Sequence, residues 1–380
     1  MTEKLYYKDA YIKEFSASVT ESVKTDKGYL TVLDKTAFFP EEGGQYSDTG
    51  SLNGIPVTHV YEKDGVIYHL TDGALRVGED VVGKINFEER FEKMQSHTAE
   101  HILSGLFFKH HGLSNVGFHL GNVDVTMDIS APLSRLELDE IERRANEIIF
   151  ENVPVRAVFP SGEELASMNY RAKLDLKENV RIVLIGDYDA CACCAPHVSY
   201  TGEIGLVKIL DTEKLRGGMR LHIAAGRRAV SVFSSLYKTA LKISDLISMP
   251  KPELFEGVDA LLTSFNRVKS EYQSFRLRSY IEKAKKADVP DSKNAVLYFD
   301  GATPTELREI ANAIADRGGE YLVLLSGEDS LQYVIVTKTV DVKDVIGNIN
   351  SELSGRGGGR GNMASGSFGV NIERVREYFK

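Results

Sequence analysis

Two pairs of metal-ligating side chains, each with a four-residue step, are the residues of this sequence best suited to do chemistry. His97 and His101 lie within residues 95–104, and Cys193 and His197 follow about ninety residues later. The first stretch predicts a helix, because its apolar residues follow helical spacing. Residues four apart share one helix face, so both imidazoles would point at one spot. Together the pairs predict a zinc site with three nitrogen ligands and one sulfur ligand, and core cysteines beside unrelated histidines are the alternative.

The three cysteines of the chain fall within four positions, at Cys191, Cys193 and Cys194. Such crowding does not suit a disulfide framework and is typical of a metal or reactive site in a reducing compartment. The four-residue step to His197 favours Cys193 as the ligand, and the other two cysteines remain rival ligands.

The chain as a whole has 380 residues, which predicts two or three domains. Its composition, 42% hydrophobic and 27% charged, is that of a globular protein. The N-terminus lacks an apolar signal region and no 18-residue apolar run occurs, so we expect a cytoplasmic protein with no membrane partner. The net charge of −9 argues against indiscriminate nucleic-acid binding but leaves room for local basic patches.

The pattern of the chain predicts an α+β multidomain fold in four parts. Residues 1–88 read as a small β-barrel domain, because short runs rich in β-branched and aromatic residues alternate with turn formers. The expected strands are 18–23, 29–33, 55–61, 66–70 and 81–85. Between them, Gly43 and Gly44 permit positive φ and close approach of backbone to a ligand, and Gln45 would present its amide at the tip. A decorated hairpin loop is the plainer interpretation of this stretch.

Residues 89–230 predict an α+β domain with a mostly antiparallel sheet. Its expected helices are 89–109, 137–151 and 162–171. Its expected strands are 123–129, 155–159, 180–185, 204–210 and 219–224.

Residues 231–292 predict a helical linker or arm, broken at 249–252. Its later part interleaves cations with aromatic residues, which suits either an ion-paired coiled-coil surface or an arm that touches a polyanion. The cations are Arg267, Lys269, Arg276, Arg278, Lys283, Lys285 and Lys286, and the aromatic residues are Tyr272, Phe275 and Tyr280.

Residues 293–380 predict a C-terminal α/β domain, because apolar strands at 295–299 and 321–325 flank a helix at 305–317 and a third strand follows at 332–337. The glycine-rich motif at 355–369 carries Arg356 and Arg360, and could cradle phosphate through backbone N–H groups or form a flexible crossing. The arm or this domain could also pair two copies of the chain as a homodimer.

Three motifs occur in the order and spacing of a known family. FFPEEGGQYSDTG at 38–50, HTAEH at 97–101 and CCAPHVSYTGEIG at 193–205 resemble the editing part of alanyl-tRNA synthetase, and still more the freestanding alanyl-tRNA editing proteins of the AlaX group. LRGGMRLHIAAGRRA at 215–229, which contains Arg220, resembles the stretch that follows there. The tail at 355–369 is similar to the glycine-rich motif of the synthetase's C-terminal domain, which DHH-type phosphoesterases share.

The resemblance implies a zinc-containing aminoacyl-tRNA deacylase that removes serine, or also glycine, from the alanine-specific tRNA. It implies His97, His101, Cys193 and His197 as zinc ligands. It also places Gln45 near the substrate end. We expect Gly43, Gly44 and Arg220 to bind the substrate, and Arg356 and Arg360, with the basic residues of 267–286, to grip the body of the tRNA. Cys194-Ala-Pro196 departs from the Gly-Gly-Thr of the synthetase, and Glu100 replaces a small or hydroxyl residue.

The chemistry of ester hydrolysis requires an activated water and stabilisation of a developing oxyanion. Four protein ligands fill a tetrahedral zinc, so the ion could hold the aminoacyl end while another group orients the water. Glu100 could be that base or orienter, and a helix-surface carboxylate is the alternative. Gln45 and Thr98 are the candidates for reading the serine hydroxyl.

A zinc-stapled, non-catalytic tRNA- or protein-binding module is the alternative function. The glycine-rich tail also suggests a phosphoesterase, but this activity is a poor match to the sequence, because no Asp-His-His metal cluster appears in it.

Overall fold

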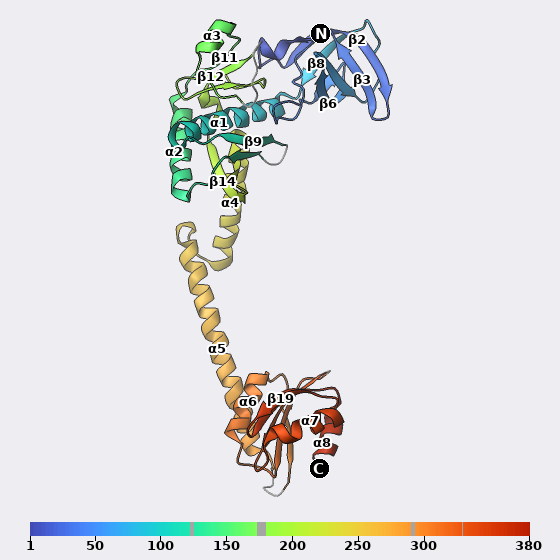
Figure 1. Ribbon diagram of the computed structural model, residues 1–380, viewed down its shortest axis with the longest axis vertical. Helices are drawn as coiled ribbons and strands as arrows, with labels where there is room; N and C mark the ends of the chain where they lie inside the picture. The colour runs from blue at the N-terminus through green and yellow to red at the C-terminus, as the bar shows by residue number, and fades with distance from the viewer. Residues whose placement is uncertain (122–124, 173–179, 290–292, 329) are drawn as a thin grey trace. The chain divides into compact units, whose positions relative to one another are not determined.

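The computed structural model describes residues 1–121, 125–172, 180–289, 293–328 and 330–380. The chain divides into two compact units, Met1–Lys242 and Ile243–Lys380 (Figure 1). Both are built from helices and mostly antiparallel sheets, so the prediction of a multidomain α+β fold is confirmed. In the part of the chain that is described, no helix combines the length and the hydropathy needed to cross a membrane.

The first element of the N-terminal unit is a closed barrel of six strands in the order β2-β3-β7-β6-β5-β8. In that order the strands are Glu14–Thr25, Gly28–Leu33, Val66–Thr71, Ile55–Lys63, Gly50–Leu52 and Asp80–Ile85. All neighbouring strands pair antiparallel, and tight turns join β2 to β3, β5 to β6 and β6 to β7. Two of these turns place Asn53 and Asp64 at positive φ before a glycine. A short parallel pair of β1 (Glu3–Lys4) and β4 (Lys35–Thr36) lies beside it.

Helix α1 (Phe87–His111) is the central element of this unit (Figure 1). Acidic residues in its first turn and basic residues in its last turn complement the helix dipole, and Gly112 ends it in the left-handed conformation. Every residue from Lys93 to Phe107 is buried. An amphipathic helix at a protein surface leaves one face exposed. The buried run from Lys93 to Phe107 has no exposed face, so other elements cover this part of α1 on all sides.

A buried ion pair ties the barrel to α1. Nε of Arg90 donates to Oδ1 of Asp48 at 2.9 Å and to Oδ2 at 2.8 Å, and Nη2 donates to the carbonyl of Ala37 at 2.6 Å. Oδ2 of Asp48 also accepts the backbone N–H of Phe39 at 2.6 Å. The loop 38–50, which carries the glycine pair and Gln45, is therefore fixed against α1 at both ends.

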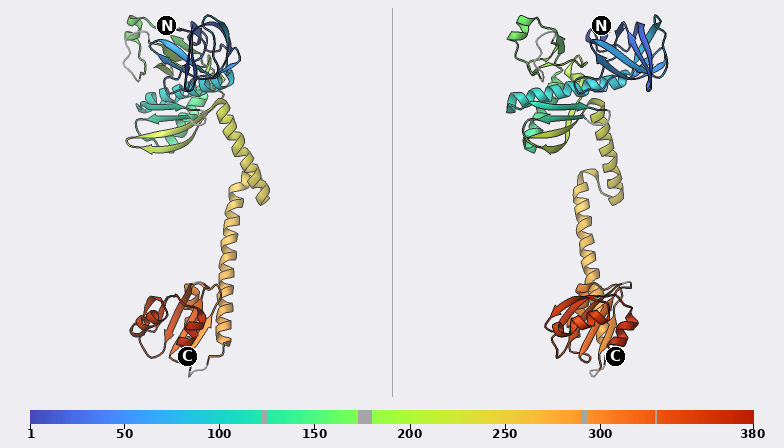
Figure 2. Two further views of the ribbon diagram at one scale, coloured as in Figure 1. Left: turned by 90° about the vertical axis from the view of Figure 1, so that its right-hand side faces the viewer. Right: turned by 45° about the vertical axis from the view of Figure 1, so that its right-hand side comes forward.

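Two antiparallel sheets and a second helix complete the surroundings of α1. The larger sheet has the order β14-β15-β10-β9 and packs with α2 (Arg135–Glu151) and α1 around one core, as two further views show (Figure 2). Its strands are Val207–Leu215, Gly218–Ala225, Val125–Ile129 and Asn115–Leu120. The smaller sheet has the order β11-β12-β13, with strands Val155–Val158, Ile182–Ile185 and Asp189–Ala192. The short helix α3 (Gly162–Ser167) follows β11, and α4 (Gly226–Ile247) follows β15.

The C-terminal unit is a five-stranded sheet in the order β16-β17-β18-β20-β19, preceded by the long helix α5 (Leu254–Lys286). Its strands are Ala295–Tyr298, Tyr321–Ser326, Leu331–Thr337, Met363–Phe368 and Arg356–Arg360. β16 and β17 pair parallel, with α6 (Pro304–Ala313) between them, so the predicted βαβ unit is present. Helix α6 and the end of α5 cover one face, and α7 (Val342–Glu352) and α8 (Ile372–Tyr378) cover the other (Figure 2).

Several predicted boundaries are wrong for identifiable reasons. The helix expected at 162–171 ends at Ser167, because Met168 is extended and the N–H of Arg171 donates to the carbonyl of Ala190. The strand expected at 204–210 begins only at Val207, because Thr201–Ile204 forms a 3-10 turn. The first two residues of the strand expected at 123–129 lie outside the described residues, and the rest is β10.

The glycine-rich motif is neither a phosphate-cradling loop nor a flexible crossing. It folds as the antiparallel pair β19 and β20 at the edge of the C-terminal sheet. A Cβ added at Gly357 or Gly366 would come within 2.6 or 2.7 Å of the hydroxyl oxygen of Tyr333. The glycines are needed so that this hairpin can pack over the Tyr333 side chain.

Candidate metal centre

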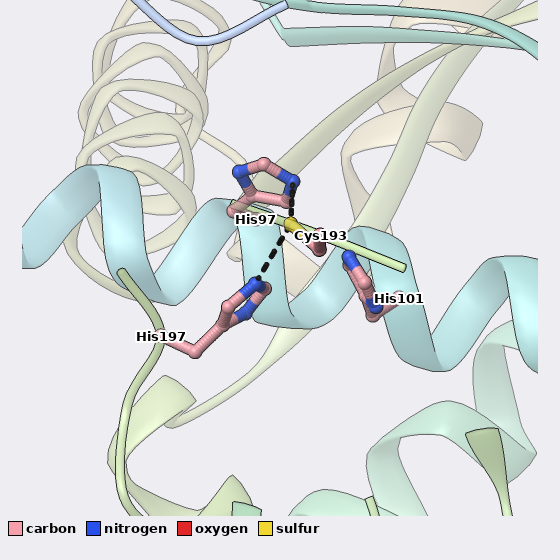
Figure 3. Close-up of side chains that lie close together, drawn as sticks. All are labelled: His97, His101, Cys193 and His197. Atoms are coloured by element: carbon pink, nitrogen blue, oxygen red, sulfur yellow. Dashed lines mark hydrogen bonds between the residues drawn. The ribbon is translucent and has the colours of Figure 1, made fainter. Parts of the chain in front are cut away.

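His97, His101, Cys193 and His197, which we call the His/Cys cluster, point at one another from two segments (Figure 3). His97 and His101 lie on one face of α1, and each is 3% exposed. Cys193 and His197 follow strand β13, where the N–H of Cys193 donates to the carbonyl of Arg181. One potential ligand atom from each residue lies within 4.8 Å of the others.

The distances within the His/Cys cluster fit a tetrahedral ion. Sγ of Cys193 lies 3.6 Å from Nε2 of His97 and 3.4 Å from Nε2 of His197. With zinc–sulfur bonds of about 2.3 Å and zinc–nitrogen bonds of about 2.0–2.1 Å, the sulfur–nitrogen edge of a tetrahedron is about 3.5 Å. The residues present therefore match zinc in ligand chemistry and in spacing.

Each imidazole of the cluster has an oxygen against its other ring nitrogen. Nδ1 of His97 lies 2.9 Å from Oε1 of Gln45, and Nδ1 of His101 lies 3.0 Å from Oδ2 of Asp189. Nδ1 of His197 lies 3.0 Å from Oγ1 of Thr98, whose own hydroxyl donates to the carbonyl of Met94 at 2.7 Å. These oxygens act as acceptors, so Nδ1 carries the proton and the Nε2 lone pair is left for a metal.

Electrostatics in the cluster favour a thiolate at Cys193 and a neutral imidazole at His197. Burial would lower the pKa of His101, but Cys191, Asp189 and Cys193 outweigh it and hold that pKa well above its ordinary value. Burial alone would raise the pKa of the Cys193 thiol, but the facing His97 and His197 outweigh it and hold that pKa well below its ordinary value. Burial lowers the pKa of His197 to about 3. Metal ligation requires deprotonated sulfur and neutral imidazole, and the pKa shifts of Cys193 and His197 both act in that direction.

A buried ion pair supports the third imidazole. Asp189, whose side chain is 1% exposed, accepts from Nε of Arg171 at 2.7 Å and from Nη2 at 2.8 Å, besides its contact with His101. Burial would raise the pKa of Asp189, but His101 and Arg171 reverse the effect and lower it. The carboxylate is thus held charged and correctly oriented behind His101.

A cavity of about 790 Å³ opens beside the His/Cys cluster. Among the described residues its lining includes His97, His101 and Cys193, and also Glu100. Glu100 is 4% exposed, which makes the helix-surface alternative wrong. Its Oε1 accepts from Ser104 and Asn115, whereas its Oε2 lies 4.0 Å from Nε2 of His101. One carboxylate oxygen is therefore fixed by the protein and the other faces the cluster.

The rival thiols also line the cavity but are arranged differently. Cys191 groups with His101 and Asp189, and burial raises the pKa of its thiol. Burial and the neighbouring Cys193 raise the pKa of the Cys194 thiol strongly. Cys193 alone belongs to the four-residue cluster of the described residues.

The glycine pair forms a tight turn with positive φ at both positions, as expected. Gly43 lines the cavity, but Gly44 packs against the backbone of Phe118, where a Cβ would meet its carbonyl oxygen at 2.3 Å. The close approach at Gly44 is thus to strand β9. Gln45 is fully buried behind His97 rather than exposed at the tip, and its Nε2 has no hydrogen-bond partner in the described chain.

The remaining predicted binding residues lie away from the cavity lining. Arg220 is on β15, where it binds both carboxylate oxygens of Asp128 at 2.8 and 2.9 Å. Arg356 and Arg360 are exposed on β19 of the C-terminal unit.

Sequence reasoning missed Asp189, Arg171 and Arg181. A histidine ligand needs an acceptor for its second ring nitrogen, so an aspartate close to the cysteine pair could have been singled out. Which carboxylate takes that place depends on how β13 packs against α1, and no local signal gives this.

Three known sequence families match parts of the chain. Residues 2–89 match the tRNA synthetases class II (A), residues 180–221 match the threonyl and alanyl tRNA synthetase second additional domain, and residues 291–379 match the DHHA1 domain. The second of these segments contains Cys193 and His197.

Known proteins match over nearly the whole chain. An alanyl-tRNA editing protein, AlaX-L, of Pyrococcus horikoshii is 28% identical over the full length of both chains. An alanine–tRNA ligase of Methanococcus maripaludis is 31% identical over 99% of this chain, which spans 43% of the ligase. The crystal structure of the C-Ala domain of Aquifex aeolicus alanyl-tRNA synthetase is 26% identical over 24% of this chain and 92% of that domain, with a TM-score of 0.21.

Proposed function

The chain is a full-length relative of an alanyl-tRNA editing protein, and from this premise we propose that it is an aminoacyl-tRNA deacylase that edits in trans. Its substrate would be the alanine-specific tRNA wrongly charged with serine, and also with glycine. The observation that carries the proposal is the convergence of three imidazole Nε2 atoms on Cys193 at the wall of a cavity of about 790 Å³. A cavity of this size suits a small ligand such as the aminoacyl end of a tRNA.

The metal in this proposal is Zn²⁺, held by His97, His101, Cys193 and His197. Bound there, zinc would supply a Lewis acid that polarises the ester carbonyl. The supporting observations are the sulfur–nitrogen distances of 3.4 and 3.6 Å and the three Nδ1 acceptors. We place the protein in the cytoplasm, where its unpaired thiols would stay reduced.

The cysteine assignment is tested by metal content. Cys193→Ala should lose the metal, whereas Cys191→Ala and Cys194→Ala should retain about one zinc per chain by elemental analysis. A Cys193→Ala protein that keeps its full zinc would move the ligand role to one of the other thiols.

Glu100 is the group that we assign to the water. Its Oε1 is held by Ser104 and Asn115, which leaves Oε2 to accept a proton from water at the cavity wall. As the water oxygen bonds to the ester carbon, that proton moves to Glu100. It then passes to the ribose oxygen as the ester bond breaks, which gives free amino acid and tRNA.

Thr98 would act through His197, which it contacts, whereas Gln45 contacts His97 through Oε1 and has its Nε2 left over. Serine and alanine differ by one hydroxyl, and a pocket that merely fits alanine excludes serine by only ~1–3 kcal/mol. A buried polar group that only the serine hydroxyl can satisfy discriminates far better, by roughly 10⁴-fold. The unpartnered Nε2 of Gln45 is such a group, and we propose it as the serine reader.

The four parts of the chain would divide this work. In the proposal, the barrel of residues 1–88 supplies the Gly43–Gly44 turn and Gln45, and residues 89–230 supply the metal centre. Residues 231–292 and 293–380 would hold the body of the tRNA, with Arg356 and Arg360 on an exposed strand. Arg276 is less suited to this task, because it binds Glu306 at 2.9 and 2.7 Å. Arg220, paired with Asp128 outside the cavity lining, would contact tRNA farther from the ester.

Helix α5 also offers a surface for a second copy of the chain. Six of its apolar side chains are exposed and repeat with steps of three and four residues: Val258, Leu261, Phe265, Val268, Tyr272 and Phe275. This spacing is that of a coiled-coil seam, which supports the homodimer through the helical arm. Sedimentation should give twice the chain mass, and Phe265→Glu with Val268→Glu should give a monomer.

The function is tested by deacylation of purified tRNA charged with serine or alanine. Serine should be released much faster than alanine from the same tRNA. Equal rates would indicate a general aminoacyl esterase. Binding of tRNA with no release of either amino acid would favour the alternative, a zinc-stapled binding module.

A further inference from the structure

Arg181 forms part of the cavity wall and has no assigned role. It is 8% exposed, and it lies just before strand β12. Its Nη1 donates to the carbonyls of Cys193 at 2.8 Å and Ala195 at 2.9 Å. Its Nε is buried without a hydrogen-bond partner among the described residues. One end of the guanidinium is thus fixed, and the edge formed by Nε and Nη2 is not.

Among the described residues, Arg181 has no carboxylate partner, which is unusual for a buried guanidinium. Within the described part of the chain, no carboxylate lies within ion-pair distance of Arg181, whereas the other cations of the cavity wall are paired. Lys4 binds Glu62 at 2.7 Å, and Arg171 binds Asp189 at 2.7 Å. A buried guanidinium without an anion destabilises the fold unless a ligand supplies one. The planar edge matches the two oxygens of a phosphate or carboxylate.

Two aromatic rings lie near the Arg181 guanidinium. The guanidinium carbon of Arg181 is 5.3 Å from the centre of the Tyr7 ring, and the Tyr7 ring is 5.7 Å from that of Phe159. Both rings line the cavity, and Phe159 is 55% exposed. Exposed aromatic faces beside a cation are a common platform for the bases of single-stranded nucleic acid.

The acylated end of a tRNA contains only one kind of anion. The amino acid carries an ammonium group, and the ester and ribose are neutral, so the negative charge resides on the phosphodiester of the terminal nucleotide. We propose that Arg181 binds this phosphate through Nε and Nη2, and that Tyr7 and Phe159 stack with the terminal base. The inference rests on the proposed function and adds the subsite that holds the 3′ nucleotide while its ester lies at the His/Cys cluster.

The test uses two non-hydrolysable probes, 3′-amide analogues of seryl-adenosine with and without a 5′-phosphate. Wild-type protein should bind the phosphorylated probe more tightly. Arg181→Gln should weaken binding of that probe by roughly 10–100-fold, the effect of losing a charge-assisted pair, and should leave the other probe within about twofold. Arg181→Lys retains the positive charge but lacks the planar pair of N–H donors, so its loss of affinity for the phosphorylated probe should be intermediate.

A second pair of variants tests the stacking surface. Tyr7→Leu should weaken both probes alike by roughly 5–100-fold, because both carry the base, whereas Tyr7→Phe should bind as the wild type does. If Tyr7→Leu binds both probes as tightly as the wild type does, the terminal base does not stack on this surface.

The same measurements separate a binding role from a structural one. If Arg181 only holds the carbonyls of Cys193 and Ala195, Arg181→Gln should weaken both probes equally and lower zinc content, and the subsite is then wrong. A wild-type protein without phosphate preference overturns it as well. Because binding of these probes needs no hydrolysis, a protein that prefers the phosphate but releases no serine would contradict the proposed function and leave the subsite standing.

Discussion

Nδ1 of His101 lies 3.0 Å from Oδ2 of Asp189, and the same carboxylate binds Arg171. The chain Arg171–Asp189–His101 therefore connects the wall of the cavity to a residue of the His/Cys cluster. Because a carboxylate only accepts, it determines which nitrogen of His101 carries the proton. The contact between His101 and Asp189 therefore orients the imidazole ring and also places a negative charge beside it.

The first prediction concerns this carboxylate. Asp189→Asn removes the charge that holds Arg171 and weakens the acceptor for His101, so zinc affinity should fall roughly 10–100-fold. Competition with a chelator of known affinity measures the zinc affinity of the variant and of the wild type. Asp187→Asn, on the exposed residue two positions earlier, is the matched control and should bind zinc as the wild type does. Unchanged affinity in Asp189→Asn would mean that the pair with His101 is dispensable.

The second prediction separates two roles of Gln45. Gln45→Glu keeps an acceptor for Nδ1 of His97 but removes the Nε2 donor, whereas Gln45→Ala removes both. If Nε2 reads the serine hydroxyl, both variants should lose the preference for serine over alanine at full zinc loading. If Gln45 only positions His97, Gln45→Glu should retain that preference. Initial deacylation rates on the two charged tRNAs decide between these outcomes.

The third prediction assigns the water-orienting group. Glu100→Gln keeps the size of the side chain and removes its basicity, so kcat should fall roughly 10²–10⁴-fold with little change in KM. Zinc content should remain that of the wild type, because Glu100 is outside the ligand set. Glu88→Gln, at the exposed start of the same helix, should retain full activity. A Glu100→Gln enzyme with normal kcat would leave the water without an assigned base.

The fourth prediction concerns pH and the barrel. His69 is fully buried, and burial lowers its pKa to about 4, from an ordinary value of 6.5. The unfolded chain takes up a proton near pH 6.5 and the folded chain does not. The free energy of unfolding should therefore decrease as pH falls from about 6.5 to 4, by at most about 3 kcal/mol from this residue. Denaturant titrations across that range measure the decrease.

A matched pair of variants isolates the effect of His69. His69→Gln should be less stable at pH 7, because buried contacts with Thr31 and Thr36 change, but its stability should depend less on pH. His59→Gln, at a half-buried site of the same barrel, should keep the wild-type dependence. Identical pH dependence in all three proteins would contradict the assignment.

The sequence predicted some relationships and not others, for physical reasons. The step from His97 to His101 is local, because an i,i+4 pair on a helix fixes its own geometry. Cys193 and His197 follow strand β13 outside any helix, so their arrangement depends on the fold. The partners of the imidazoles of the His/Cys cluster are Gln45, Thr98 and Asp189, and only tertiary packing brings two of these to α1. Glycine carries no strand signal, so the glycine-rich motif predicts a loop, although packing over Tyr333 requires glycine at Gly357 in β19 and Gly366 in β20.

The separation of the two ligand pairs along the chain has a consequence for biosynthesis. His101 leaves the ribosome 92 residues before Cys193, a delay of roughly 5–20 s at ordinary rates of translation. During that interval the nascent chain contains only two of the four side chains of the His/Cys cluster, and Asp189, which orients one of them, is also still to be made. A metal can be captured by all four side chains only after β13 has docked on α1 and His197 has been made, so loading of the centre reports that synthesis has passed His197.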